Sequence, residues 1–286
     1  MMIINNTRAI NEREFELLRD YIAEHSGILI PPEKSYLIET RLSGMMASLG
    51  MAAFGELYDY IVKSKDPAVR RKVIDAITTN ETMWFRDGAP WKVMEEKVLP
   101  SLTRTLVSGE KSRARFWFSA VSTGQEAYST VMCVDDFLYK NGIKGITLAD
   151  FDFFATDISG GVLETAKKGR YDQISIMRGL DEYYKNKYFT KNGPAWEIDG
   201  KIREAVRFSE FNLQSDYHLL GKFDVIFCRY VMIYFPERTN REIAEKMSEA
   251  LREGGVLFIG NYVFYELFDE YFDTNHYGNL TYYSKR

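Results

Sequence analysis

The sequence contains few of the residues that build metal centres and disulfide frameworks. Its 286 residues include two cysteines, Cys133 and Cys228, which lie far apart without a CxxC pair, and three histidines that are scattered singly. This distribution disfavours a zinc motif and a disulfide-stabilised secreted fold. We expect no metal site, and we expect both cysteines to behave as small buried hydrophobic residues in a reducing compartment.

Long apolar runs and an excess of basic residues are also missing. No run approaches the roughly 18 apolar residues of a membrane span, and the N-terminal stretch lacks the apolar core of a signal peptide. The formal net charge is −4, from 41 acidic and 37 basic side chains. A general nucleic-acid binder needs a basic surface. We therefore expect a cytoplasmic protein without a nucleic-acid partner and without membrane insertion.

The first quarter of the chain has the pattern of a small helical bundle. Apolar residues follow helical spacing over 11–26, and Gly27 stands where that helix should end. Three more amphipathic segments follow between 31 and 78, the first of them after a proline pair. The pattern predicts an N-terminal helical domain at 1–78.

Beyond residue 113, strand-like apolar runs alternate with helical patterns. Continuous apolar runs are typical of parallel strands that are buried on both faces. We expect an α/β fold with a doubly wound, mostly parallel sheet in a domain at 79–286, with 279–286 as an edge strand. The alternation breaks over about 172–207, where Asp199-Gly200 predicts a hairpin. We interpret this segment as a small inserted β-subdomain.

The first strand ends in the corner "STGQE" at 122–126. A dinucleotide-binding corner would carry G-x-G-x-x-G to hold a pyrophosphate, and only Gly124 is present. One glycine still lets the backbone approach a ligand that carries no phosphate, so we include Gly124 among the cofactor-binding residues. Glu126 enters the first turn of the next helix, where it either contacts a ligand or simply favours the helix N-terminus.

Asp157 ends the second strand. Nucleoside-binding α/β folds place a carboxylate at this position, where it accepts hydrogen bonds from ribose hydroxyls. The alternative is that Asp157 or Ser159 caps the next helix. Taken with the one-glycine corner, Asp157 indicates a nucleoside without a pyrophosphate, and S-adenosylmethionine fits that description.

Later segments supply further candidates. Asn212 follows the third strand, where it could read the amide-like edge of adenine or act as a turn residue. Tyr234-Phe235 follow the fourth strand and could equally be core packing. The segment 78–91 carries Arg86 among large apolar side chains. It is either a capped linker helix or a segment that closes over a ligand and presents Arg86 to an anionic substrate.

In order and spacing, these motifs resemble those of one family, the chemotaxis receptor methyltransferases (CheR proteins), over roughly residues 75–262. The matching strings are "NETMWFR", "WFSAVSTGQEAYS", "FATDISGGVLETAKKGRY", "FSEFNL", "FDVIFCRYVMIYF" and "LREGGVLFIGN". The resemblance implies an enzyme that uses S-adenosylmethionine to methylate glutamate side chains on the cytoplasmic helices of chemoreceptors, with S-adenosylhomocysteine as product. We expect the protein to be a monomer. The resemblance also implies catalytic roles for Arg86 and Tyr234. The cofactor-binding positions that it implies are Asn80, Thr82, Arg86, Glu126, Asp157, Asn212, Leu213, Arg229 and Tyr230.

Departures from the family pattern leave a second function open. Tyr230 replaces the asparagine of the usual Cys-Arg-Asn, and Asn261 replaces the histidine of the usual Gly-His-Ser-Glu. The alternative is a cofactor-binding scaffold that has lost turnover, or a methyltransferase-like protein that acts on a different protein partner. The presence of Arg86 and Tyr234 favours the enzyme. The absence of an Asn/Asp-Pro-Pro-aromatic motif disfavours methylation of nucleic acid.

Overall fold

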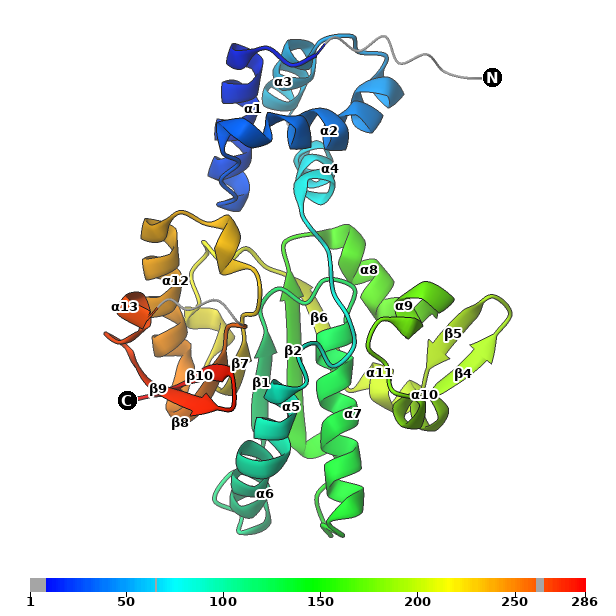
Figure 1. The fold of residues 1–286 in the computed structure, drawn as a ribbon, viewed down its shortest axis with the longest axis vertical. Coiled ribbons are helices and arrows are strands. Elements are labelled where there is room, and N and C mark those ends of the chain that lie inside the picture. Colours follow the sequence, from blue (N-terminus) through cyan, green and yellow to red (C-terminus); the bar gives the residue numbers. More distant parts are fainter. Residues whose placement is uncertain (1–8, 65, 261–264) are drawn as a thin grey trace.

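The first part of the protein is a helical bundle, drawn at the top of Figure 1. The structure is a computed structural model that describes residues 9–64, 66–260 and 265–286. The bundle contains α1 (Glu12–Ser26), the 3₁₀ turn η1 (Pro32–Lys34), α2 (Ser35–Leu49), α3 (Phe54–Lys63) and α4 (Pro67–Ile77). These helices share one apolar core, in which Leu18, Leu42 and Leu57 are fully buried. The predicted helices are confirmed, and Gly27 ends the first of them with left-handed backbone at φ 77°.

The central element is a seven-stranded sheet in the order β6-β2-β1-β7-β8-β10-β9. Its strands are β1 (Ala114–Phe118), β2 (Phe151–Asp157), β6 (Val206–Glu210), β7 (Phe223–Phe227), β8 (Leu251–Phe258), β9 (Phe272–Tyr277) and β10 (Leu280–Lys285). The pairs from β6 to β8 are parallel, and β10 runs antiparallel to β8 and β9. The predicted mostly parallel α/β sheet is confirmed. Because β1 pairs with β2 on one side and β7 on the other, the strand order reverses there, which is where such folds bind ligands.

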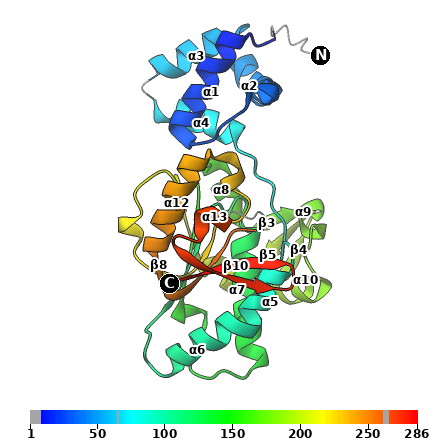
Figure 2. The same ribbon diagram turned by 60° about the vertical axis from the view of Figure 1, so that its left-hand side comes forward.

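Helices cover both faces of this sheet (Figures 1 and 2). Successive side chains of a strand point to opposite faces. Phe116 and Phe118 pack in one core with α5 (Ala89–Val93), η2 (Met94–Val98), α6 (Leu99–Val107) and α7 (Gln125–Lys140). Trp117, which lies between them, packs in the other core with α12 (Glu237–Ala250) and α13 (Tyr265–Phe268). The continuous apolar runs of the sequence therefore reflect burial on both faces.

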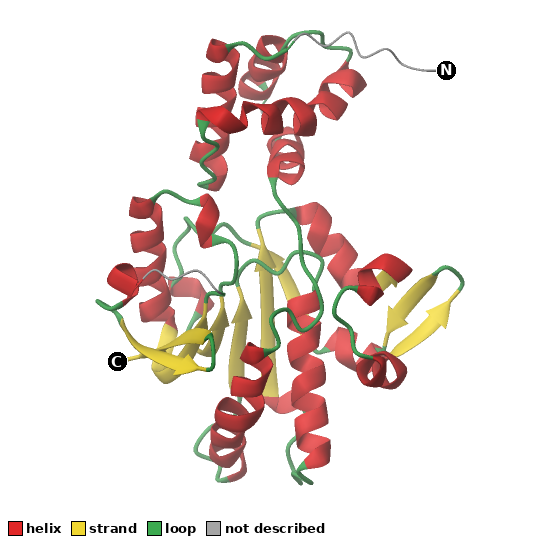
Figure 3. Ribbon diagram, in the orientation of Figure 1, coloured by secondary structure: helices red, strands yellow, loops and turns green. Residues whose placement is uncertain are grey.

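A small three-stranded antiparallel sheet lies beside α7 (Figure 3). It contains β3 (Arg170–Asp172), β4 (Phe189–Asn192) and β5 (Ala195–Ile198), and α8 (Gly160–Lys168), α9 (Gln173–Met177), α10 (Glu182–Tyr188) and α11 (Gly200–Glu204) lie around it. The hairpin predicted at Asp199-Gly200 is wrong. The Asp199 side chain accepts a hydrogen bond from the Lys201 amide and begins α11, and the chain reverses at Gly193 instead. Aspartate caps helices as readily as it forms turns, so the dipeptide alone was ambiguous.

The C-terminal strands also differ from the prediction. The segment 279–286 was expected at an edge, yet β10 lies between β8 and β9, so β9 is the edge strand. The β9 sequence "FDTNHY" is largely polar, which suits an edge but gives little apolar signal. Short 3₁₀ turns complete the description at η3 (Leu148–Asp150), η4 (His218–Leu220) and η5 (Met232–Tyr234). Across the described ranges, no helix combines the length and apolar character that crossing a membrane requires.

Candidate cofactor and active site

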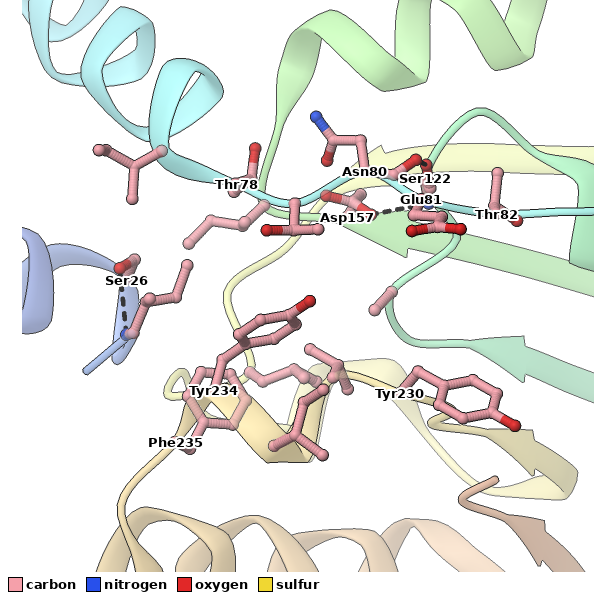
Figure 4. A pocket seen from close by; sticks show the side chains of 18 of the residues that line it. Ser26, Thr78, Asn80, Glu81, Thr82, Ser122, Asp157, Tyr230, Tyr234 and Phe235 are labelled. Atoms are coloured by element: carbon pink, nitrogen blue, oxygen red, sulfur yellow. Dashed lines mark hydrogen bonds between the residues drawn. The ribbon is translucent and has the colours of Figure 1, made fainter. Parts of the chain in front are cut away.

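A cavity of about 650 Å³ lies at the carboxyl ends of the strands, between the sheet and the helical bundle (Figure 4). Its volume falls within the roughly 300–1,000 Å³ of small-molecule sites. The loops after β1, β2, β6 and β7 line it, together with the segment 77–83 that leaves α4. The loop after α1, including Ile28, Leu29 and Ile30, adds an apolar wall. This wall was not predicted from the sequence.

The structure brings nearly all of the predicted site residues to this cavity. Those that line it are Asn80, Thr82, Arg86, Glu126, Asp157, Asn212, Leu213, Arg229, Tyr230 and Tyr234. Gly124 is not among the lining residues. Its φ is 97°, and a Cβ there would lie 3.1 Å from Ala166 Cβ and from the Tyr128 ring. Gly124 therefore permits the tight turn into α7 and its close packing against α8.

Asp157 is held by two backbone amides. Its carboxylate accepts hydrogen bonds from Ser122 N at 2.8 Å and Ser159 N at 3.0 Å. The next helix is capped by the Ser159 side chain, so the capping alternative applies to Ser159. Burial raises the pKa of Asp157, although the two amides oppose that shift. A carboxylate has about four acceptor sites, so Asp157 can still accept hydrogen bonds from a ligand.

A buried ionic network lies beside Asp157. The Arg229 side chain is 1% exposed and pairs with Glu126 at 2.7 Å and with Asp87. It also donates to the carbonyl oxygen of Arg86 at 3.0 Å. Burial raises the pKa of Glu126, and the attraction of Arg229 opposes that rise. Asp87 was not predicted as a site residue, although it directly follows Arg86 in the string "FRDG".

Arg86 reaches the cavity from an irregular segment. Residues 80–88 form no helix, since α5 begins only at Ala89, and the backbone is left-handed at Phe85 and Asp87 with φ of 44° and 70°. The capped-linker-helix alternative is therefore wrong. The Arg86 guanidinium lies over the Tyr230 ring, with its carbon 3.6 Å from the ring centroid, and the Tyr230 hydroxyl donates to Asp87.

Tyr234 and Asn212 lie where the sheet meets the helical bundle. In Figure 4 the Tyr234 ring projects into the cavity toward Asp157. The Tyr234 carbonyl accepts a hydrogen bond from Leu29 N at 2.9 Å. The Asn212 side chain accepts from Gln214 N at 2.9 Å and donates to the His25 carbonyl at 3.0 Å. Asn212 thus forms the turn and ties it to α1. The expected departure at Asn261 lies outside the described residues.

The chemistry of the cavity fits S-adenosylmethionine. Asp157 offers acceptors for a ribose diol, and opposite charges nearby match the ammonium and carboxylate of an amino acid. Among the described residues, Arg229 Nε is buried and has no hydrogen-bond partner, which is uncommon for a polar atom and consistent with a ligand contact. Neither Gly124 nor its neighbours form a phosphate cradle, so a dinucleotide fits less well.

The strand order, with an antiparallel strand inserted next to the edge, and a nucleoside-sized site at the reversal define a class I S-adenosylmethionine-dependent methyltransferase fold. Residues 80–272 match the CheR methyltransferase SAM binding domain, and residues 13–78 match the CheR methyltransferase all-alpha domain. The chain therefore belongs to the CheR methyltransferase family, and S-adenosylmethionine is its cofactor.

Curated relatives cover most of the chain. It is 40% identical to chemotaxis protein methyltransferase 1 of Pseudomonas aeruginosa and 39% identical to chemotaxis protein methyltransferase Cher2 of Pseudomonas putida. Both matches cover 86% of this chain and 88% of the relative. Chemotaxis protein methyltransferase of Borreliella burgdorferi is 32% identical, over 88% of each chain.

Proposed function

We propose that the protein forms methyl esters on glutamate side chains of chemoreceptor cytoplasmic helices, and that it acts in the cytoplasm as a monomer. The relatives named chemotaxis protein methyltransferase support the receptor as partner. The observation that carries the proposal is the placement of Arg86 and Tyr234 on one cavity with Asp157 and Glu126. Arg86 supplies a cation for a substrate carboxylate, and Tyr234 supplies a hydroxyl. Both thus lie beside Asp157 and Glu126, the groups that suit the cofactor.

The binding roles follow from charge and hydrogen-bonding capacity. Asp157 accepts hydrogen bonds from the ribose hydroxyls, and its two backbone donors keep it oriented. Glu126 provides the acceptor for a cationic group, while Arg229 balances its charge inside the protein. The other residues that we assign to cofactor binding are Asn80, Thr82, Leu213 and Tyr230. Asn212 forms the turn on which Leu213 lies. Gly124 acts indirectly, through the turn into α7.

The reaction needs no general base. When bound, S-adenosylmethionine supplies a methyl carbon to which a carboxylate oxygen forms a bond while the sulfonium sulfur takes the electron pair of the bond that breaks. A glutamate has an ordinary pKa of about 4.3, so at neutral pH it is already the nucleophile. The protein must align this carboxylate and remove water from it. Arg86 orients the carboxylate, and the Tyr234 hydroxyl lines the channel through which it approaches.

The cavity mouth suits an amphipathic protein segment. Leu29 and Ile233 line the cavity and remain 48% and 40% exposed, so a bound protein segment could contact both side chains. Lys34 lies on the same side, where it can attract an acidic substrate. Apolar residues that flank a target glutamate on a receptor helix would contact Leu29 and Ile233.

The test is transfer of labelled methyl from S-adenosylmethionine to membranes that contain chemoreceptors. We expect incorporation that is released by mild base, as glutamate methyl esters are, and that disappears when the target glutamates are replaced by alanine. Calorimetry with S-adenosylhomocysteine separates the two functions that the sequence left open. Binding without transfer to any receptor would support the scaffold, and base-stable label would contradict ester formation.

A further inference from the structure

Tyr230 is fixed on several sides beside the cavity. The Arg86 guanidinium covers its ring, and a Cβ added at Gly260 would lie 3.1–3.2 Å from three ring carbons, so Gly260 also approaches the ring closely. The Tyr230 backbone is left-handed at φ 60°, and its amide donates to the Ile259 carbonyl at 3.2 Å. In Figure 4 its hydroxyl points away from Tyr234 and Asp157, so the ring forms a side of the cavity and does not fill it.

Arg86 depends on this ring for its orientation. Among the residues that the structure describes, its guanidinium forms no hydrogen bond or ion pair, and the Tyr230 ring is its close contact. A long arginine side chain without such a contact would sample many rotamers. Stacking through the face of the guanidinium leaves the N–H groups at its edge available, and these are the groups that bind a carboxylate with two parallel hydrogen bonds.

The hydroxyl of Tyr230 extends the arrangement into the protein interior. It donates to Asp87, Asp87 pairs with Arg229, and Arg229 pairs with Glu126. The stack is therefore anchored to a buried ionic network and is not a free surface contact. Asparagine, which the family pattern leads one to expect here, has no ring on which Arg86 could stack.

We propose that Tyr230 is a positioning residue that holds the Arg86 guanidinium by its face, so that its edge binds a carboxylate in the cavity. The carboxylate is either the side chain of the substrate glutamate or the α-carboxylate of the cofactor. This inference rests on the proposed function only for the identity of that ligand. The stack itself is a property of the protein alone and can be measured without cofactor or receptor.

The first experiment measures the stack in the free protein. A guanidinium over an aromatic ring experiences the ring current, so the Arg86 Nε–Hε signal in a proton–nitrogen NMR spectrum should lie upfield of those of exposed arginines. The signal is identified by its loss in R86K. We expect Y230F to keep the shift and Y230N and Y230L to abolish it. The control Y139N changes a tyrosine whose ring lies near Lys187 and which is 78% exposed, and it should leave the signal unchanged.

The second experiment is a pair of double-mutant cycles with R86A and Y230L. One cycle uses the Kd of S-adenosylhomocysteine from calorimetry, and the other uses kcat/KM for labelled methyl transfer to receptor. We expect Y230L to cost about tenfold in the wild-type background and less than about twofold in R86A, because a cation–π contact can act only while Arg86 is present. Coupling in the binding cycle would identify the cofactor carboxylate as the group that binds Arg86. Coupling in the transfer cycle alone would identify the substrate glutamate as that group.

Several outcomes would overturn the inference. An Arg86 signal at an ordinary position in the wild-type protein, or equal costs of Y230L with and without Arg86 in both cycles, would reduce Tyr230 to a structural role. Thermal unfolding of each variant accompanies the cycles, and Y230F, which keeps the ring, should show the upfield Arg86 signal even if Y230N folds poorly. Wild-type protein that shows the NMR shift but neither binds S-adenosylhomocysteine nor transfers methyl would refute the proposed function and leave the stack intact.

Discussion

Removing the Arg229 guanidinium should destabilise the protein, because two partly buried carboxylates depend on its charge. In R229M, Glu126 and Asp87 would lose the cation between them, and their side chains are only 13% and 24% exposed. Loss of one partner from a buried ion pair costs about 3–5 kcal/mol, and the partial exposure of the carboxylates places the expected loss near about 3 kcal/mol. At about 2–4 °C per kcal/mol for chains approaching this length, the midpoint of thermal unfolding should fall by about 6–12 °C.

The loss of stability in R229M should depend on pH. Burial already raises the pKa of Glu126 above its ordinary value of 4.5, and removal of Arg229 raises it further. An acid with a raised pKa in the folded state holds a proton that the unfolded chain releases, so stability falls as the pH rises from the ordinary pKa through the raised one. The deficit of R229M should therefore be smallest near the ordinary pKa of glutamate and should grow as the pH is raised above it.

Two further variants make the test specific. R229M/E126Q removes one of the two unpaired charges, that of Glu126, and should recover part of the lost stability. R238M changes an arginine that is 91% exposed and pairs with Glu242, and it should shift the midpoint little. Circular dichroism during heating and urea unfolding both report the change. A midpoint for R229M within about 2 °C of R238M, or a double variant no more stable than R229M, would refute the reasoning.

The other predictions concern single side chains. Y234F should lower kcat for methyl transfer while leaving the Kd of S-adenosylhomocysteine nearly unchanged; equal losses in both would show that Tyr234 binds the cofactor. D157N should weaken S-adenosylhomocysteine binding by about 10- to 100-fold in calorimetry, since hydrogen bonds to a charged acceptor contribute about 1.5–3 kcal/mol. G124A should destabilise the protein by about 1–3 kcal/mol in urea unfolding, because φ is 97° and the new methyl group would press on Ala166; unchanged stability would contradict that strain.

The sequence predicts the core elements of the fold because burial leaves a periodic record. Apolar residues follow helical spacing over 11–26, and the structure contains α1 over Glu12–Ser26. The order of the strands in the sheet produces no such periodic pattern in the sequence. β10 pairs with β8 and β9 through backbone hydrogen bonds, and nothing in "LTYYSK" tells an inner strand from an edge strand. That is why the C-terminal arrangement could not be predicted.

The candidate site, too, could be predicted from the sequence only in part. Asp157 and Glu126 could be predicted, because carboxyl ends of parallel strands meet at one edge of the sheet and polar residues there stand out. The contacts of the helical bundle with the site could not, since Leu29 donates its backbone amide and His25 offers its carbonyl oxygen, and neither depends on residue type. Asp87 carries a charge that the sequence shows, but its pairing with Arg229 is seen only in the structure.

A crystal structure of the protein with S-adenosylhomocysteine tests the central claim most directly. We expect the nucleoside to occupy the 650 Å³ cavity with its ribose hydroxyls on Asp157 and its sulfur facing Arg86 and Tyr234. Density for the ligand elsewhere, or a sulfur directed away from both residues, would contradict the assignment of this cavity as the methyl-transfer site.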